Sequence, residues 1–477
     1  MMEELTLYEK VGQIISIVDG WVWDWPLMVL IFATGILLTL RSGLVQVLHL
    51  PKALRFMFQN ESDGEGEVTS FGALCTALSA TIGTGNIVGV ATAICIGGPG
   101  ALFWMWLAAF FGMATKYAEG LLAIKYRTIE ADGHVLGGPF YYIERGMGKS
   151  WKWLAMLFAF FGATAGLLGI GTVTQINGVA GAVEALFDPT KAHIAFTIGK
   201  YSYTWATTIT AVVVSLLVAL VIIGGIKRIA KVAEVVVPFM AVFYIVICVI
   251  ILVSNAAAIP GAFALIFKSA FTGTAATGGF VGATIKLAIS KGVGRGIFSN
   301  EAGLGSAPIA AAAASTNSCV RQGLVSMTGV FIDTIIICTM TGLTIIITGA
   351  WYQPGLEGVA VTSYAFAQGM SFAPFIGQLC VTLSLMFFAF TTILGWDYYA
   401  ERCVEYLTGG SMTVVKFYRY LWILAVLVGP FLALDPVWDL ADALNGLMAF
   451  PNLVALVALS GVVAAETRDF MIKHRDF

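Results

Sequence analysis

Long apolar runs recur along almost the whole chain, and they restrict its fold more than any other feature of the sequence. A bilayer core is about 30 Å thick and takes roughly 20 apolar residues as one helix. Reading the chain against this length predicts eleven membrane-spanning helices. They are expected near residues 22–40, 71–93, 100–124, 153–185, 203–224, 232–254, 263–290, 322–349, 373–401, 413–433 and 440–464.

The composition excludes most other classes of protein. Hydrophobic residues make up 58% of the 477 residues and charged residues only 11%, whereas soluble domains are about 45–50% apolar and about 25% charged. A net charge of −2 leaves no basic face for a nucleic acid. The four histidines show no HExxH spacing and the seven cysteines form no CxxC pair, so we expect neither a catalytic metal nor an enzyme. The prediction is an all-α, polytopic membrane protein.

Basic residues are divided unevenly between the two sides of these spans. With the N-terminus outside, the inner side holds all but four of the 26 Lys and Arg residues, including the group from Lys286 to Arg321; the four are Lys10, Lys191, Lys200 and Lys268. Basic residues accumulate in cytoplasmic loops, so we expect an outer N-terminus and a cytoplasmic C-terminus. The short acidic N-terminus and compact loops suggest a prokaryotic inner membrane.

Two of the eleven spans are weakly apolar because they are rich in Gly, Thr and Ser. One contains the run from Ala77 to Gly89, the other the run from Phe271 to Phe280. Each Gly costs roughly 1 kcal/mol against Ala inside a helix, although small residues can also serve close helix packing. After the opening helix, these are the first and sixth spans of ten. Interrupted helices at corresponding positions in two halves indicate an inverted-repeat transporter.

We therefore expect one transmembrane transporter domain over residues 1–477. It would contain a peripheral N-terminal helix within 1–50, inverted repeats at 70–254 and 255–464, and a cytoplasmic tail at 465–477. At each break, free amides could hold a carboxylate and free carbonyls a cation. Thr and Asn oxygens with bare carbonyls are hard ligands that suit Na⁺. A channel would favour charged rings or repeated pore motifs, and we see neither.

Several uncommon strings in the chain carry a resemblance to a known family. They are Thr76 to Ala93, Gly97 to Ala101, Phe103 to Trp106, Gly137 to Pro139, Arg295 to Pro308, Phe331 to Thr334 and Gly395 to Tyr399. The chain thereby resembles the alanine or glycine:cation symporters (sodium:alanine symporters), within the leucine-transporter-type superfamily. The resemblance implies a 5+5 inverted repeat with one extra N-terminal helix. It also implies Na⁺-coupled uptake of a small neutral amino acid, with a proton-coupled carrier of the same fold as the alternative.

The resemblance also implies roles for individual residues. The substrate carboxylate is expected at Gly83, Thr84, Gly85 and Asn86, with Gln175 as a polar contact and Gly278, Gly279 and Phe280 as the opposite wall. Thr392 and Trp396 share one helix face and would limit side-chain volume together with Phe280. A sodium site would use the carbonyls of Ser79 and Ile82 and the hydroxyls of Thr391 and Thr392.

Three acidic residues within or beside spans remain open to interpretation. Asp333 is read equally as a cation or proton site and as a structural carboxylate near the cytoplasmic start of its span. Glu301 is read as a first-turn acid after an N-cap at Ser299, and Asp397 as a partner of Arg402. The sequence leaves open alanine against glycine, D against L, the stoichiometry and the oligomeric state.

Overall fold

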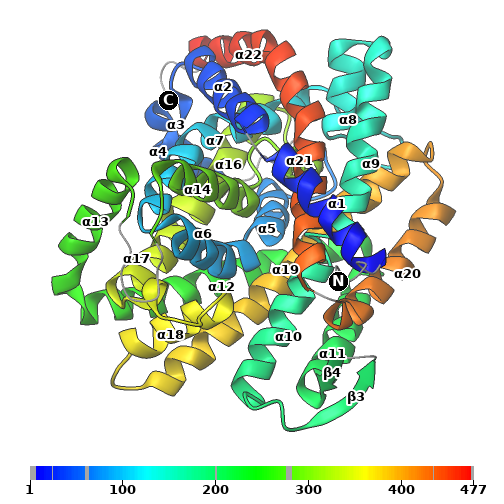
Figure 1. Ribbon diagram of the computed structural model, residues 1–477. Coiled ribbons are helices and arrows are strands. Elements are labelled where there is room, and N and C mark those ends of the chain that lie inside the picture. The colour runs from blue at the N-terminus through cyan, green and yellow to red at the C-terminus, as the bar shows by residue number, and fades with distance from the viewer. Residues whose placement is uncertain are drawn as a thin grey trace.

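The computed structural model describes residues 7–23, 25–59, 64–198, 201–274, 282–432 and 434–473, and within them the chain is almost entirely helical (Figure 1). The strands in this part of the chain form two short antiparallel hairpins. These pair β1 (Thr128–Ile129) with β2 (Val135–Leu136) and β3 (Ile194–Ile198) with β4 (Tyr201–Thr204). The predicted all-α class is confirmed.

The helices before the middle of the chain include a broken one followed by long ones. They are α1 (Leu7–Val22), α2 (Trp25–Arg41), α3 (Val45–Leu48), α4 (Leu50–Met57), α5 (Ser70–Thr81), the π-helical η1 (Gly85–Gly89), α6 (Val90–Gly97), α7 (Gly100–Lys125), α8 (Pro139–Tyr142), η2 (Ile143–Met147), η3 (Lys149–Trp151), α9 (Lys152–Leu168), α10 (Val173–Phe187), α11 (Trp205–Ile222) and α12 (Gly225–Ser254).

The remaining helices include two more interrupted stretches. They are η4 (Ala256–Ala258), α13 (Ile259–Thr272), α14 (Ile285–Asn300), α15 (Ala307–Ala312), α16 (Cys319–Val330), the π-helical η5 (Phe331–Cys338), α17 (Thr339–Ile347), η6 (Ala350–Tyr352), α18 (Val359–Gly369), α19 (Pro374–Leu407), α20 (Met412–Val428), η7 (Gly429–Phe431), α21 (Leu434–Ala458) and α22 (Ser460–Lys473).

Long apolar helices make this a multi-pass membrane protein. In the described part of the chain, nine helices are long and apolar enough to cross a bilayer, or ten if the bent pair α5 and α6 counts as one span. These ten coincide with ten of the eleven predicted spans, because the length of an apolar run is a direct consequence of bilayer thickness. The count of eleven is not confirmed.

The span predicted over residues 263–290 is wrong as a single helix. Helix α13 ends at Thr272, Gly273 has a φ of 72°, and Thr274 and Ala283 exchange backbone hydrogen bonds of 2.9 and 2.8 Å. Helices α13 and α14 are therefore separate elements, and residues 275–281 between them lie outside the described part of the chain. Gly, Thr and Ser are typical of turns and loops as well as of a broken helix.

The helices around the centre face the lipid, whereas those at the centre do not. Of the most apolar stretch of Gly100–Lys125, 83% of the residues are buried, against 28% in Met412–Phe431. Figure 1 shows α5, α14 and α16 at the centre, with α13, α18, α11 and α20 around them. Helix α14 packs against α7 and α6. It can carry Lys291 and Arg295 because this packing shields it from lipid.

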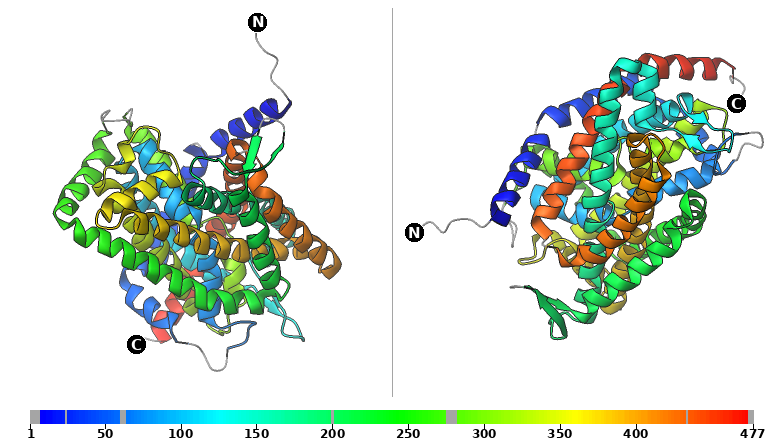
Figure 2. Two further views of the ribbon diagram at one scale, coloured as in Figure 1. Left: turned by 90° about the horizontal axis from the view of Figure 1, so that it is seen from below. Right: turned by 90° about the vertical axis from the view of Figure 1, so that its right-hand side faces the viewer.

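The two ends of the bundle carry different elements. Figure 2 (left) shows α22, α4 and the β1–β2 hairpin at one end and the β3–β4 hairpin at the other. We call these the α22 end and the β3–β4 end.

Two arginines of the basic group from Lys286 to Arg321 have partners in different parts of the bundle. Arg295 pairs with Asp442 of α21 across 2.9 Å, whereas Arg321 donates to the carbonyl of Gln59 beside α4, at the α22 end.

Candidate substrate and cation site

The first interrupted helix lies where the sequence predicts it. Helix α5 ends at Thr81, Ile82 is extended (φ −75°, ψ 95°), and the axis bends by 51° before the helix resumes at Gly85. A Cβ on Gly83 would lie 2.5 Å from Oγ1 of Thr392 and 3.2 Å from Oε1 of Gln175. Glycine at this position is what lets α10 and α19 approach the break.

Side chains satisfy the amides that the break frees from helical pairing. The Gly83 N–H donates to Oδ1 of Asn86 (2.9 Å), and the Thr84 N–H donates to Oε1 of Gln175 (3.2 Å). Gln175 in turn donates to the carbonyl of Ile170 (2.9 Å) in the segment between α9 and α10. The structure thus brings together Gly83, Thr84, Asn86 and Gln175 around two amides that point at oxygen acceptors.

Neutral oxygens gather on the other side of the same break. The hydroxyl of Thr392 lies 3.3 Å from the carbonyl oxygen of Ile82, and both residues are buried. Ser79 lies against α19, since a Cβ on Gly395 would be 2.7 Å from its Oγ. Thr391 faces elsewhere, with its hydroxyl 3.5 Å from the sulfur of Met240 and bonded to its own helix.

A second interruption begins at the end of α14, about 20 residues after the predicted one. Glu301 is left-handed (φ 57°), and Gly303 and Gly305 have φ values of 89° and 84° before α15 starts at Ala307. The expected N-cap at Ser299 is therefore wrong, because Ser299 lies in the last turn of α14 and Glu301 follows the helix end. Glycines supply the positive φ angles that end the helix here.

Side chains of α7 hold this second segment in place. Lys116 donates to the carbonyl of Asn300 (2.9 Å), satisfying an acceptor at the end of α14. Glu119 accepts from the Gly303 N–H (3.1 Å) and from the Asn452 amide (2.7 Å). Lys116 and Glu119 are buried charges, which need such partners. Their hydrogen bonds hold the end of α14 and the segment after it against α7.

Asp333 joins the two interruptions. Its carboxylate accepts from Asn86 (2.7 Å), Ser299 (2.9 Å) and Thr334 (2.7 Å), and it is fully buried. It lies in the middle of the Cys319–Ile347 helix, in the π-helical η5, and not near one end as the sequence suggested. A π-helical turn in a long helix frequently marks a functional position.

Trp396 lies one turn after Thr392 on α19 and is held by the second interruption. Its indole N–H donates to Oε1 of Glu301 (2.7 Å), and Ser306 donates to Oε2 of the same carboxylate (2.6 Å). A Cβ on Gly171 would lie 2.7 Å from Cβ of Trp396. The interruption between α9 and α10 thus makes room for this side of α19.

Gly278, Gly279 and Phe280 lie outside the described residues, so their role as the opposite wall stays a prediction. The described side chain nearest to that role is Phe298 of α14: a Cβ on Gly85 would lie 3.4 Å from its ring and 3.1 Å from Cα of Ser299. Sequence analysis missed Phe298 and Ser299 as site residues. The available signal was Gly303-Leu304-Gly305, which repeats the Gly-x-Gly of the first break.

At the α22 end, Arg127 ties the entrance of α5 to the exit of α15. Its guanidinium donates to the carbonyls of Ala312 and Ala314 (both 2.6 Å) and of Glu65 and Thr316 (both 2.7 Å). The Arg127 guanidinium therefore links the residues before α5 to the end of α15 and the residues after it.

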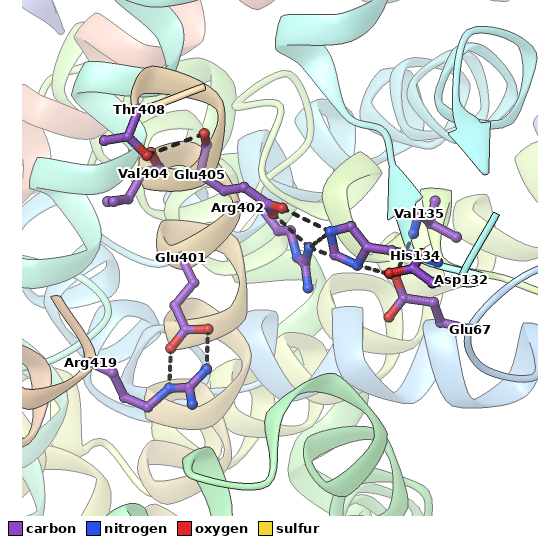
Figure 3. Close-up of polar contacts among 10 residues, drawn as sticks. All are labelled: Glu67, Asp132, His134, Val135, Glu401, Arg402, Val404, Glu405, Thr408 and Arg419. Atoms are coloured by element: carbon purple, nitrogen blue, oxygen red, sulfur yellow. Dashed lines mark hydrogen bonds and ion pairs between the residues drawn. The ribbon is translucent and has the colours of Figure 1, made fainter. Parts of the chain in front are cut away.

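A second polar cluster lies beside it, on the β1–β2 hairpin and α19 (Figure 3). His134 lies 2.8 Å from Glu405 and 3.3 Å from Glu67, and Arg402 pairs with Glu405 across 2.6 Å. The expected pairing of Asp397 with Arg402 is wrong, because Arg402 pairs with Glu405 and faces His134, whereas the carboxylate oxygens of Asp397 have no hydrogen-bond partner in the described part of the chain.

Comparison with known proteins places this geometry in context. Residues 8–476 match the sodium:alanine symporter family. The chain is 49% identical to the sodium/alanine symporter AgcS of Methanococcus maripaludis over 96% of each chain, and 53% identical to an uncharacterized transporter of Haemophilus influenzae over 98% of each.

Among solved structures, the fold matches that of MhsT in complex with L-phenylalanine. The TM-score is 0.55 at 14% identity, covering 84% of this chain and 98% of that one. At this identity the likeness concerns the fold, which is of the leucine-transporter type.

Proposed function

This chain belongs to the sodium:alanine symporter family, and we propose that it couples the inward movement of Na⁺ to the uptake of a small neutral amino acid, alanine or glycine, by alternating access. It is a transporter and not an enzyme. The observation that carries the proposal is the pair of amides and the buried oxygen set on opposite sides of the Ile82–Gly85 break. The proton-coupled alternative is not favoured, since the family is described by its sodium coupling.

The substrate carboxylate would bind at the amides of the first break. Gly83 and Thr84 each donate to a side-chain oxygen of Asn86 or Gln175. These oxygens stand where carboxylate oxygens would, so the carboxylate would exchange with at least one of them. A helix N-terminus favours negative charge by roughly 0.3–1 kcal/mol, and Gly85 leaves room for backbone approach.

Na⁺ is a transported substrate that would bind beside this carboxylate. We assign it to the carbonyls of Ser79 and Ile82 and the hydroxyls of Thr392 and Thr391. The contact between Thr392 and Ile82 supports these two ligands most directly. Thr391 would have to turn away from Met240 to join them. All four residues are buried, and uncharged oxygens suit a monovalent hard cation at such depth.

The second interruption would close the pocket on the side of the substrate's side chain. Thr392, Trp396 and Phe298 are the described groups that limit its volume, and Asp333 ties the two interruptions through Asn86 and Ser299. The predicted outer N-terminus and cytoplasmic C-terminus, in a prokaryotic inner membrane, would place the α22 end in the cytoplasm. The basic residues at that end, Lys125, Arg127 and Arg145 among them, support this orientation.

Uptake of labelled alanine into proteoliposomes tests the function. An inward Na⁺ gradient alone should drive accumulation, and an inward proton gradient in Na⁺-free buffer should not. Accumulation with the proton gradient alone would contradict sodium coupling and favour the proton-coupled carrier.

A further inference from the structure

A cavity lies at the α22 end, and none of the residues that line it belongs to either interruption. It has a volume of about 920 Å³ and is bounded by α4, the first turn of α16 and the outer face of α22. Figure 2 (left) shows α4 and α22 together at this end of the bundle. Nothing in the transport cycle proposed above uses this cavity.

Positive charge dominates the cavity. Four cations line it (Lys52, Arg55, Arg321 and Lys473) against two carboxylates, Glu466 and Asp469. Glu466 forms an ion pair across 2.6 Å with Lys125, which is not among the lining residues. The charge of Glu466 is therefore largely balanced from outside, and among the described residues that line the cavity the cations outnumber the carboxylates.

Aromatic rings hold two of these cations close together. The Lys52 ammonium lies 5.6 Å from the ring centre of Phe56 and 5.3 Å from that of Phe470, and the Arg321 guanidinium lies 4.6 Å from Phe56. Lys52 of α4 and Arg321 of α16 thus lie at the same ring of Phe56, where one anion could contact both. Phosphate is the anion that Arg and Lys bind best in such an arrangement.

The surroundings of the cavity indicate where this phosphate comes from. Val47, Leu48 and Phe58, which flank α4 on both sides, are 53%, 64% and 72% exposed. Apolar side chains exposed beside Lys52 and Arg55 are typical of a segment that lies in the bilayer interface. Basic pockets in such positions bind anionic headgroups.

We propose that this cavity binds the phosphate headgroup of an anionic phospholipid, whose acyl chains lie along the exposed apolar residues next to α4. Lys52, Arg55, Arg321 and Lys473 contact the phosphate, and the start of α16, whose first turn Ser318 caps, faces it with its positive dipole end. The lipid then links α4, which leads to α5, with α16 and α22.

Titration of the full-length protein in phosphatidylcholine nanodiscs tests this assignment. Short-chain phosphatidylglycerol is added and binding is measured by native mass spectrometry, with inorganic phosphate and glycerol phosphate as separate arms. The variant is Arg55→Gln/Lys473→Gln, because both residues are exposed and support no core packing. The matched control is Lys149→Gln/Lys416→Gln, two exposed lysines outside the cavity.

We expect phosphatidylglycerol to bind at least ten-fold more tightly than phosphatidylcholine. Each cation near a membrane surface contributes roughly five-fold in affinity, so the double variant should lose about twenty-fold and the control should lose nothing. Melting temperature and alanine binding of both variants should match the wild type. The proposal would be overturned if phosphatidylglycerol and phosphatidylcholine bound equally tightly, or if the double variant bound phosphatidylglycerol as tightly as the wild type. If inorganic phosphate displaced phosphatidylglycerol at the concentration at which the lipid itself binds, the cavity would be a site for free phosphate and the assignment to a lipid would be wrong.

Discussion

The indole N–H of Trp396 donates to Oε1 of Glu301 across 2.7 Å, joining α19 to the segment between α14 and α15. Both groups are buried, so losing the acceptor leaves a buried donor unpaired at a cost of about 1–3 kcal/mol. Glu301→Ala should weaken alanine binding by roughly 5- to 100-fold. Glu301→Gln keeps an acceptor oxygen and should lose much less. Calorimetric titration measures both variants, and equal affinities for them would show that the contact does not position Trp396.

Gly85→Ala should abolish alanine binding without unfolding the protein. The added Cβ would lie 3.1 Å from Cα of Ser299, a backbone atom that cannot turn away. Gly294→Ala on α14 is the matched control, because no atom lies within 4 Å of its Cβ position. Alanine titration should detect binding to the control alone. Normal binding to Gly85→Ala in a well-folded sample would remove the first break from the carboxylate site.

Phe298→Ala should admit larger neutral amino acids such as valine or leucine, while weakening alanine. Each methylene that a pocket accommodates changes the discrimination between two substrates by about 1–3 kcal/mol. The preference for alanine over valine or leucine should therefore change by ten-fold or more. Phe280→Ala tests the position that the sequence predicted for the same wall. Competition of labelled alanine uptake by a panel of amino acids compares the two variants. An altered profile for Phe280→Ala alone would reject the assignment to Phe298.

His134 should make the α22 end sensitive to pH. Hydrogen bonds to Glu405 and Glu67 raise its pKa to about 9, from about 6.5 in an unfolded chain. A raised pKa gives stabilisation that is complete below pH 6.5 and is lost as the pH rises through 9. The melting temperature of the wild type should therefore exceed that of His134→Gln at pH 6, and the two should converge by pH 10. A difference in melting temperature that stays constant from pH 6 to pH 10 would contradict a protonated His134 at the lower pH.

The spans could be predicted from the sequence because each apolar run has the length of the bilayer core. The first break could also be predicted, since Gly83 and Gly85 interrupt an otherwise apolar helix. The second was missed although Gly303-Leu304-Gly305 repeats the Gly-x-Gly pattern, because the Gly-rich stretch before α14 also has the composition of a broken helix. The buried hydrogen bonds of Asp333 join three segments that lie far apart in the chain, so no local sequence pattern could predict them.

The central claim is that Na⁺ and the substrate bind together at the first break. Titration of alanine into the purified protein, in NaCl and in choline chloride, tests it most directly when wild type, Thr392→Val and Thr382→Val are compared. Thr382 lies on the same helix, and its hydroxyl donates to the carbonyl of Gln378 one turn earlier. We expect the wild type and Thr382→Val to bind alanine at least ten-fold more tightly in Na⁺, and Thr392→Val to need roughly ten-fold more Na⁺ for the same affinity. Equal affinities in NaCl and choline chloride for the wild type would contradict the account.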